Sequence, residues 1–349
     1  MKIAIIRNDG IGDLIVSSPI IASIKKYKPT SKIHIYCSNR NLEYCQLLKE
    51  NKIIDDYYLI PGKSNLIQKI LLILNIRKHQ YDNIFVLSPK NINYFYSKFS
   101  GAQTSGIILI NTGKNGNDRY RPAKILSSFL LDFNETIDCR NDFYNSMDIH
   151  YSDHYVSLLK KTYPSIELPA YLYLKPKIKS SITTTLNENN IFNYIILHLD
   201  EKWNRTNWSS NELIELIKKI NLNINEKIII TEGIIKTSFN RGLGSFNFKK
   251  INNNSILYKS TEFKKIFLIK DINSNDLFSL VSKSKLVIQK HGGLVHMASS
   301  YNIPVIDIIY PKTENFLKKW HPKSDKYIQI TNKNFSYTSE LIIKFIRDY

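Results

Sequence analysis

Each half of the chain opens with the same succession of a buried strand, a polar loop and an amphipathic helix. In the first half, an apolar run at 2–7 leads into a polar glycine-containing turn, and a segment with helical spacing follows at 14–29. In the second half, an apolar run at 193–199 leads through a polar loop into a helical pattern at 209–221. Alternating strands and helices of this length predict βαβ units and a mostly parallel sheet in each half.

The length of 349 residues fits two domains, because one domain usually takes about 100–200 residues. Prolines and a Ser/Thr/Asn-rich stretch mark a change of texture near the middle of the chain. We therefore predict an α/β protein with two doubly wound, Rossmann-like domains that face one another across a cleft. The predicted parts are an N-terminal domain at 1–165, a linker at 166–190, a second domain at 191–330 and a C-terminal helix at 331–349. This helix could pack on either domain, and packing back on the N-terminal domain is one of the two possibilities.

Charge and composition restrict the classes of partner. Lys and Arg outnumber Asp and Glu by 49 to 30, which gives a net charge of +19 and favours an anionic partner. Nucleic acid ranks below a phosphate-bearing small molecule and an anionic membrane face, because no nucleic-acid-binding motif accompanies the charge. No apolar run reaches the ~20 residues of a membrane-spanning helix. Three cysteines without CxxC spacing predict neither a disulfide framework nor a zinc site, and a reducing, cytoplasmic location.

The first motif is the turn Asn8–Asp13, which holds Gly10, Gly12 and two carboxylates, Asp9 and Asp13. It lies at the carboxyl end of a predicted strand, where ligands bind in doubly wound folds. Its glycine spacing fits neither the dinucleotide fingerprint nor a Walker loop. The structural alternative is that Asp9 caps the following helix and Asp13 interacts favourably with its dipole.

The second motif, Lys290–Met297, repeats this arrangement in the second half. His291, Gly292, Gly293, Leu294 and His296 follow an apolar strand and open a helix, so backbone amides are exposed in a way that suits phosphate. Two histidines without a carboxylate or third ligand nearby in the sequence make a metal site improbable. A buried, hydrogen-bonded structural histidine is the alternative for either one.

The third motif is the polar loop at 198–208. Lys202 and Arg205 are candidates to hold a diphosphate there, and Trp203 and Trp208 are candidates to stack on a ring, with helix packing as the alternative for Trp208. Glu232 follows the next strand, where its carboxylate could accept hydrogen bonds from sugar hydroxyls.

Together these motifs resemble glycosyltransferase family 9, the lipopolysaccharide heptosyltransferases, which have the two-domain GT-B fold. The similarity covers nearly the whole chain, and its most specific part runs from 271 to 311. The resemblance implies that Asp13 is the catalytic base. It also implies a donor-binding set around the phosphates and ribose of the nucleotide sugar. That set is Lys202, Arg205, Glu232, His291, Gly292, Gly293, Leu294 and His296, with Asp9, Gly10 and Gly12 on the acceptor side.

Two positions depart from the family pattern. The family has Asp-Thr-Gly where this chain has His291-Gly292-Gly293, so an acid is replaced by a potential cation and a hydroxyl is lost. The family's phosphate-contacting Lys lies two residues before a Trp. If Trp208 is that Trp, the position holds Thr206, and either Lys202 or Arg205 supplies the charge.

The resemblance implies transfer of a heptose from ADP-heptose to a lipopolysaccharide core or related saccharide, without a metal or cofactor. The expected acceptor is anionic and lipid-linked, and the net charge of +19 fits peripheral contact with the inner face of the cytoplasmic membrane. Nucleic acid is not an expected partner. Three alternatives stay open: a related transferase that uses another nucleotide-sugar donor for a surface polysaccharide, a non-catalytic nucleotide-sugar binding protein and, third, a nucleic-acid-binding protein.

Overall fold

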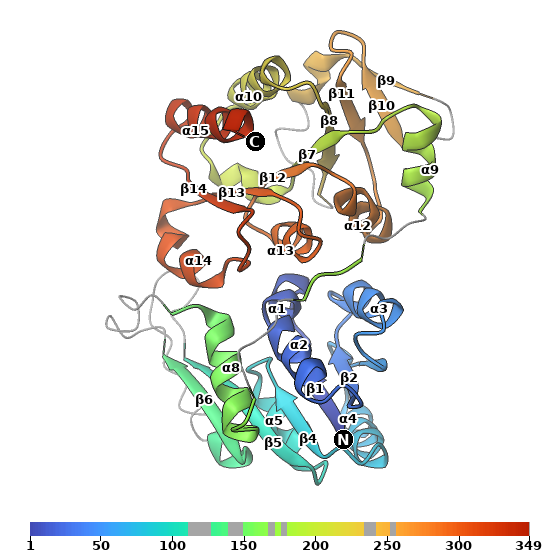
Figure 1. The fold of residues 1–349 in the computed structure, drawn as a ribbon, viewed down its shortest axis with the longest axis vertical. Helices are drawn as coiled ribbons and strands as arrows, with labels where there is room; N and C mark the ends of the chain where they lie inside the picture. Colours follow the sequence, from blue (N-terminus) through green and yellow to red (C-terminus); the bar gives the residue numbers. More distant parts are fainter. Residues whose placement is uncertain are drawn as a thin grey trace. The chain divides into compact units, whose positions relative to one another are not determined.

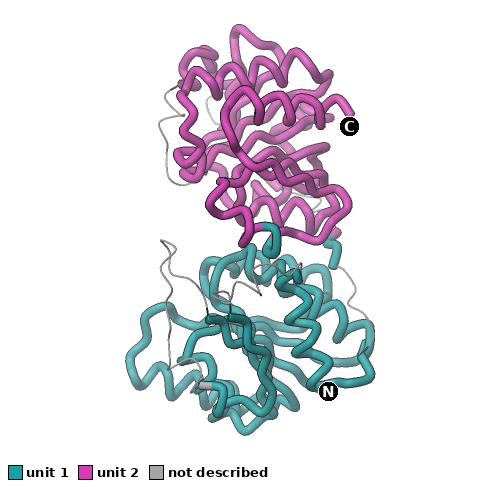
Figure 2. Tube along the Cα trace, turned by 90° about the vertical axis from the view of Figure 1, so that its left-hand side faces the viewer, with its two compact units in different colours: residues 1–174, 318–320 teal, residues 175–317, 321–349 magenta. Residues whose placement is uncertain are grey.

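The computed structural model describes residues 1–110, 127–138, 149–166, 172–175, 180–233, 242–251 and 256–348. The chain divides into unit 1, Met1–Leu174 with Lys318–Trp320, and unit 2, Lys175–Leu317 with His321–Tyr349 (Figure 2). The boundary lies inside the predicted linker at 166–190, of which 167–171 and 176–179 are outside the described residues. Among the helices that are described, none is both long enough and apolar enough to cross a membrane.

Unit 1 is built on one parallel sheet. Its strands are β1 (Lys2–Ile6), β2 (Lys32–Cys37), β3 (Asp56–Leu59), β4 (Asn83–Val86), β5 (Gln103–Ile110) and β6 (Phe133–Asp138). Its helices are α1 (Ile11–Val16), α2 (Ser18–Tyr27), α3 (Leu42–Glu50), α4 (Leu66–Lys78), α5 (Asn91–Lys98) and α8 (Tyr151–Thr162), with the 3₁₀ turn η1 (Ser127–Leu130).

The strand order in unit 1 is β3-β2-β1-β4-β5-β6, with every described pairing parallel. The order reverses between β1 and β4, because the chain first moves outward through β2 and β3 and then returns to β1's other side. Figure 1 shows α2 and α8 side by side in front of this sheet, and α4 packs with α5. The reversal point is where doubly wound folds bind ligands.

Unit 2 has a larger, mixed sheet. Its strands are β7 (Tyr194–Leu199), β8 (Lys227–Glu232), β9 (Phe248–Lys250), β10 (Leu257–Ser260), β11 (Ile266–Ile269), β12 (Leu286–Lys290), β13 (Val305–Ile309) and β14 (Tyr327–Thr331). Its helices are α9 (Ser181–Glu188), α10 (Ser210–Asn223), α12 (Ser274–Ser282), α13 (Gly293–Ser300), α14 (Glu314–Trp320) and α15 (Phe335–Asp348). Its 3₁₀ turns are η2 (Glu201–Arg205), η3 (Leu243–Phe246) and η4 (Pro311–Thr313).

The strand order in unit 2 is β14-β13-β12-β7-β8-β11-β10-β9. Strands β14 to β11 are parallel, whereas β10 runs antiparallel to both β11 and β9. The order reverses between β7 and β12, so unit 2 has its own ligand-binding point at the carboxyl ends of these two strands. The prediction of two Rossmann-like α/β domains is confirmed.

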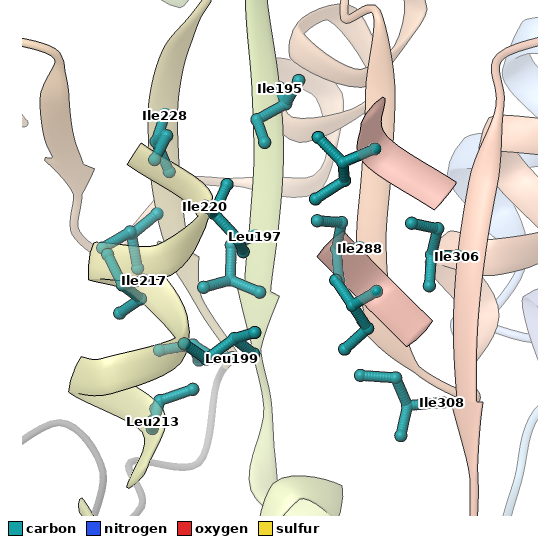
Figure 3. Close-up of a cluster of buried hydrophobic side chains, with 14 of the residues drawn as sticks. Ile195, Leu197, Leu199, Leu213, Ile217, Ile220, Ile228, Ile288, Ile306 and Ile308 are labelled. Atoms are coloured by element: carbon teal, nitrogen blue, oxygen red, sulfur yellow. The ribbon is translucent and has the colours of Figure 1, made fainter. Parts of the chain in front are cut away.

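The core of unit 2 follows from two hydrophobic periods (Figure 3). Alternate residues of β7, Ile195, Leu197 and Leu199, face the same side of the sheet, as the two-residue period of a strand requires. On α10, Leu213 and Ile217 belong to the same cluster with spacing of one helical turn, and Ser209 caps the start of this helix by accepting from the Glu212 N–H.

The structure corrects the prediction for the linker and decides between the two places left open for the C-terminal helix. The stretch predicted to be a linker contains α9, which packs on α12. Its helix signals are only the Ser180 cap and the apolar Ile182 and Leu186, and the residues around them are mostly polar. The C-terminal helix α15 packs on α10 in unit 2, and Ile342 and Ile346 enter the unit 2 core, so it does not take the place expected on the N-terminal domain.

Candidate functional site

Unit 1 carries its candidate residues where the sheet order reverses. The loop after β1 runs from Arg7 to Gly10 and leads directly into α1, while Ser88 and Lys90 follow β4, the neighbouring strand. The backbone N–H of Asn8 donates to the Ser88 hydroxyl at 2.8 Å, so the two strand ends are joined. The predicted turn is therefore at the ligand-binding edge of the sheet.

A buried arginine organises this loop. Arg7 is 1% exposed, and its guanidinium lies 3.2 Å from an Asp9 carboxylate oxygen and 3.8 Å from an Asp13 carboxylate oxygen. It also donates to the Leu87 carbonyl and, at 3.1 Å, to the Tyr155 hydroxyl. One fixed cation thus holds both acids of the turn, because a buried guanidinium needs compensating charge and acceptors.

Asp13 combines a structural contact with a perturbed carboxyl group. Its Oδ2 accepts from the Gly10 N–H at 2.9 Å, which caps α1. Burial raises the pKa of Asp13 above its ordinary value, and Arg7 opposes this rise while Asp9 adds to it. The expected helix-start role is present, and a carboxylate with a raised pKa is also a better proton acceptor. Gly12 lies inside α1 and not in the turn, because the helix already begins at Ile11.

Asn8 is fixed from several sides. Lys90 Nζ donates to the Asn8 carbonyl at 2.6 Å and to its side-chain oxygen at 2.9 Å, and Asn93 Nδ2 donates to the same side-chain oxygen at 3.0 Å. The Ser38 hydroxyl donates to the Asp9 carbonyl at 3.0 Å. The loop that carries the candidate base is therefore preorganised by its neighbours.

A pocket of about 470 Å³ opens beside this loop. Asn8 and Lys90 form one side of its lining, and Lys63 and Lys69 contribute two more ammonium groups. The remaining lining residues are Ser38, Ile60, Pro61, Gly62, Ser64, Ile92 and Tyr96. Three lysines and no acidic residue in the lining suit an anionic ligand next to Asp9 and Asp13.

Unit 2 places its candidate residues at the corresponding point of its own sheet. The loop at Asp200–Arg205 follows β7, and His291 and Gly292 follow β12, the strand paired with β7. Gly292 precedes the first residue of α13, so the backbone amides of Gly293 and Leu294 lie at the start of a helix. These two segments are far apart in the sequence and lie together at the carboxyl ends of β7 and β12.

Lys202 lies directly over Gly292. A Cβ placed on Gly292 would meet the Lys202 ammonium and would approach Gln289 Nε2 to 2.8 Å. Lys202 Nζ is 3.5 Å from Asp200 Oδ2, and its side chain is 32% exposed. Arg205 is exposed at the far end of η2. Of the two cations left open by the sequence, Lys202 is the one placed against the glycine turn.

Lys290, the first residue of the second motif, is a further cation at this edge, to which the sequence analysis assigned no role. It is 3% exposed, and its Nζ has no hydrogen-bond partner within the described ranges of the chain. Burial lowers its pKa from 10.5 to about 8; Asp307 opposes this effect and Arg205 adds to it. A buried amine without a partner is destabilising, which makes it a candidate for ligand binding.

His291 pairs with a carboxylate from the next strand. His291 Nδ1 lies 2.6 Å from Oδ2 of the fully buried Asp307, and that oxygen also accepts from the Tyr327 hydroxyl at 2.6 Å. No carboxylate lies beside this motif in the sequence, but the fold brings one to it. Asp307 is 16 residues away in the sequence, but β13 pairs directly with β12. Position 291 lacks the acid of the family pattern, but Asp307 on the neighbouring strand β13 supplies a carboxylate next to it.

The two histidines of the motif differ in exposure. His296 is 2% exposed and meets the His291 ring edge-on, with the ring centroids 5.3 Å apart. Leu294 is also buried. The structure thus shows His296 as a buried residue that packs against the ring of His291. The described residues contain no group of three or more His, Cys, Asp or Glu side chains arranged to hold a metal ion.

The tryptophans do not offer a stacking face. Trp203 is fully buried and Trp208 is 7% exposed, and both belong to the hydrophobic core of unit 2. Their indole N–H groups donate to the His198 carbonyl and to Asn332 Oδ1. The expectation that they stack on a ligand ring is wrong, because both rings are buried in the core and hold the loop against it. Thr206, between them, is buried and donates its hydroxyl to the Trp203 carbonyl.

Glu232 ends β8 beside the same loop. It is opposite Leu199 in the β7–β8 register, and a Cβ on Gly233 would come within 2.9 Å of Asp200 Cβ. The Glu232 side chain is half-buried. Its carboxylate is therefore at the edge that carries Lys202, as the resemblance requires for a ribose contact.

The comparisons with known proteins match glycosyltransferases over nearly the whole chain. No family model matches the sequence. The lipopolysaccharide heptosyltransferase 1 of Campylobacter coli is 22% identical over 98% of this chain and 92% of its own length. A solved glycosyl transferase family 9 protein from Veillonella parvula has a TM-score of 0.70 at 14% identity, covering 98% of this chain and 89% of that one.

The resemblance to family 9 is confirmed. The E. coli heptosyltransferase WaaC with ADP superposes on 100% of this chain and 99% of its own, with a TM-score of 0.68 at 12% identity. The expected enzyme class, a glycosyltransferase of the GT-B type, is confirmed with it.

The residues missed by the sequence analysis had weak local signals. Lys290 ends an apolar strand, a position where a buried ammonium is unusual, and this was the one usable sign. Asp307 and Lys90 act through partners distant in the sequence, so only the strand order brings them to the site. Arg7 is close in the sequence to the acids of its turn, but its contacts with Leu87 and Tyr155 are distant in the sequence.

Proposed function

We propose that this glycosyltransferase transfers a heptose from ADP-heptose to an anionic saccharide of the lipopolysaccharide core type, without a metal or cofactor. The observation that carries the proposal is the cation-lined helix start of unit 2. There, Lys202 lies over Gly292 and Lys290 is buried without a hydrogen-bond partner in the described part of the chain. The names of the Campylobacter coli relative and of the ADP-bound E. coli structure support the choice of donor.

The donor's diphosphate would bind at the start of α13. Backbone N–H groups and ammonium groups both favour the negative charge that develops on the β-phosphate as the sugar C1–O bond breaks. Lys202 and Lys290 supply fixed cations for this charge, and Glu232 would accept hydrogen bonds from the ribose. The leaving nucleoside diphosphate keeps the bonding electron pair.

Unit 1 would bind the acceptor and remove its proton. The pocket with Lys63, Lys69 and Lys90 suits an anionic saccharide. The acceptor hydroxyl oxygen forms the new bond to C1 of the sugar, and its proton passes to the Asp13 carboxylate. Because burial raises the pKa of Asp13, this group is a stronger base than an ordinary aspartate.

A thermal-shift screen with ADP, UDP, GDP, CMP and their sugars tests the donor. A ligand at 100 times its Kd stabilises the folded state by about 2.7 kcal/mol, which corresponds to a rise in Tm of roughly 5–10 °C for a domain of this size. We expect this rise with ADP and ADP-heptose, and unchanged transfer in EDTA. If no nucleotide raises the Tm, the donor site is wrong.

The second candidate is a transferase with another nucleotide-sugar donor. His291 and its contact with Asp307 favour it, because an imidazole replaces the carboxylate that the family presents at this position. A Tm rise with UDP-, GDP- or CMP-sugars and none with ADP would support this candidate in the same screen.

A further inference from the structure

Helix α4 of unit 1 is apolar on both sides. Its inner side packs on the unit 1 core through Leu72, Ile73 and the fully buried Ile76. Its outer side exposes five large aliphatic side chains, which we call the α4 face: Leu66 (71% exposed), Ile67 (68%), Ile70 (48%), Leu71 (58%) and Leu74 (53%). A helix that is apolar all round normally has partners on all sides.

The helix is well formed and does not depend on a partner to fold. Asn65 accepts from the Gln68 N–H at 2.8 Å, and Gln68 Oε1 accepts from the Asn65 N–H at 3.1 Å, which is a reciprocal cap. Arg77 and Lys78 lie in the last turn, where cations favour the helix dipole. The α4 face is therefore presented on a fixed element.

A second helix, in contact with α4, also exposes apolar side chains. Helix α5 packs beside α4 and exposes two aromatic rings, Phe95 (43%) and Phe99 (56%), which stack at a centroid distance of 6.2 Å. Aliphatic and aromatic side chains on neighbouring helices exceed the scattered apolar residues normal on a protein surface.

The charge around the α4 face has one sign. From residue 57 to residue 81 the sequence contains Lys63, Lys69, Arg77 and Lys78 and no Asp or Glu. A second copy of the chain would bring the same positive charge against this surface in a symmetric contact, which is unfavourable. An anionic lipid surface supplies both the apolar phase and the opposite charge.

We propose that the α4 face docks on an anionic lipid bilayer, with its aliphatic side chains among the acyl chains and the flanking bases at the headgroups. Lys63 and Lys69 also line the 470 Å³ pocket, so docking brings the acceptor pocket to the headgroup level. A lipid-linked saccharide then enters that pocket from the surface on which the enzyme rests. The docking step itself does not depend on which sugar is transferred.

Flotation of the full chain with vesicles tests the proposal. We expect the protein to float with phosphatidylglycerol–phosphatidylethanolamine vesicles and not with phosphatidylcholine vesicles. The triple variant Ile67→Gln/Leu71→Gln/Leu74→Gln removes the centre of the α4 face, and its binding should fall at least ~10-fold. A matched variant removes three exposed apolar side chains of unit 2, Phe192→Gln/Leu222→Gln/Tyr337→Gln, and should bind like the wild type.

The charge and the oligomeric state supply the remaining controls. Arg77→Gln/Lys78→Gln should weaken binding and flatten its salt dependence. Wild-type-like binding by the triple variant, equal binding to neutral vesicles, or no vesicle binding at all would overturn the proposal. So would a dimer in sedimentation velocity that only the triple variant dissociates, since a second copy would then cover the α4 face. An ADP-induced Tm rise in the triple variant shows that the donor site is intact, so failure here is distinct from failure of the transferase proposal.

Discussion

Replacing Lys290 with methionine should stabilise unit 2. The lysine is 3% exposed, and burial lowers its pKa from 10.5 to about 8. At about 1.4 kcal/mol per pH unit, this difference corresponds to about 3 kcal/mol of free energy by which burial of the charged amine disfavours folding. Methionine has a similar length and no charge to desolvate, so most of that free energy should be recovered.

The effect has a defined dependence on pH. Below about pH 8 the amine is charged in the folded and unfolded states, and the destabilisation is fully present. As the pH rises from 8 to 10.5, the folded state loses its proton first, so the wild type becomes more stable relative to its unfolded state. The advantage of the Lys290→Met variant should therefore be largest at pH 7 and shrink toward pH 10.5.

Urea unfolding of both proteins at several pH values measures this difference. Lys344→Met makes the same chemical change at an exposed position of α15 and should shift stability by no more than about 0.5 kcal/mol. A Lys290→Met protein that is no more stable than the wild type at pH 7, or whose advantage is independent of pH, would refute the reasoning. The variant should also bind ADP about 10-fold or more weakly, because it loses a charged donor to phosphate.

Two further substitutions test other parts of the site, and a third tests the contact of Glu135 on β6 with His154 and Lys161 on α8. Asp13→Asn should lower the transfer rate by about 10²–10⁴ while ADP still raises the Tm, and a rate near that of the wild type, or an equal loss in Asp9→Asn, would remove Asp13 from its role as base. Gly292→Ala should displace the Lys202 ammonium and weaken ADP binding in calorimetry, whereas Gly244→Ala, with no atom within 4 Å of its Cβ, should bind normally. Glu135→Gln should cost about 2–3 kcal/mol at pH 7, because hydrogen bonds with His154 and Lys161 outweigh the effect of burial and lower the pKa of Glu135 from 4.5 to about 2. This contribution is present above pH 4.5 and is lost as the pH falls to 2, so the unfolding curves of the two proteins should converge in acid.

The fold could be read from the sequence because its signals are local. The two-residue period of β7 and the helical spacing of α10 are visible in the residues themselves, and their alternation predicts a parallel sheet. Helix α9 was missed because one Ser cap and two apolar residues are a weak signal within a Ser/Thr/Asn-rich stretch. The position of α15 depends on which surface its isoleucines meet, and sequence periodicity does not specify that.

The candidate site was predictable in position and only partly in content. Polar residues after β1, β7 and β12 were found because the carboxyl ends of parallel strands bind ligands. The inward turn of Trp203 and Trp208 was not predicted, since a tryptophan in a polar loop has no sequence mark that separates packing from stacking. The unpartnered amine of Lys290 depends on burial, which emerges only when neighbouring strands are assembled.

The contact between His291 and Asp307 limits how this donor edge can change over evolutionary time. An aspartate introduced at position 291 alone would set two carboxylates against each other in a place almost without water, and one of them would have to take up a proton. Conversely, an apolar residue at 307 alone would leave the imidazole without its acceptor. Exchange between this arrangement and the one typical of the family therefore requires both positions to mutate together, which predicts that homologues vary at 291 and 307 as a correlated pair.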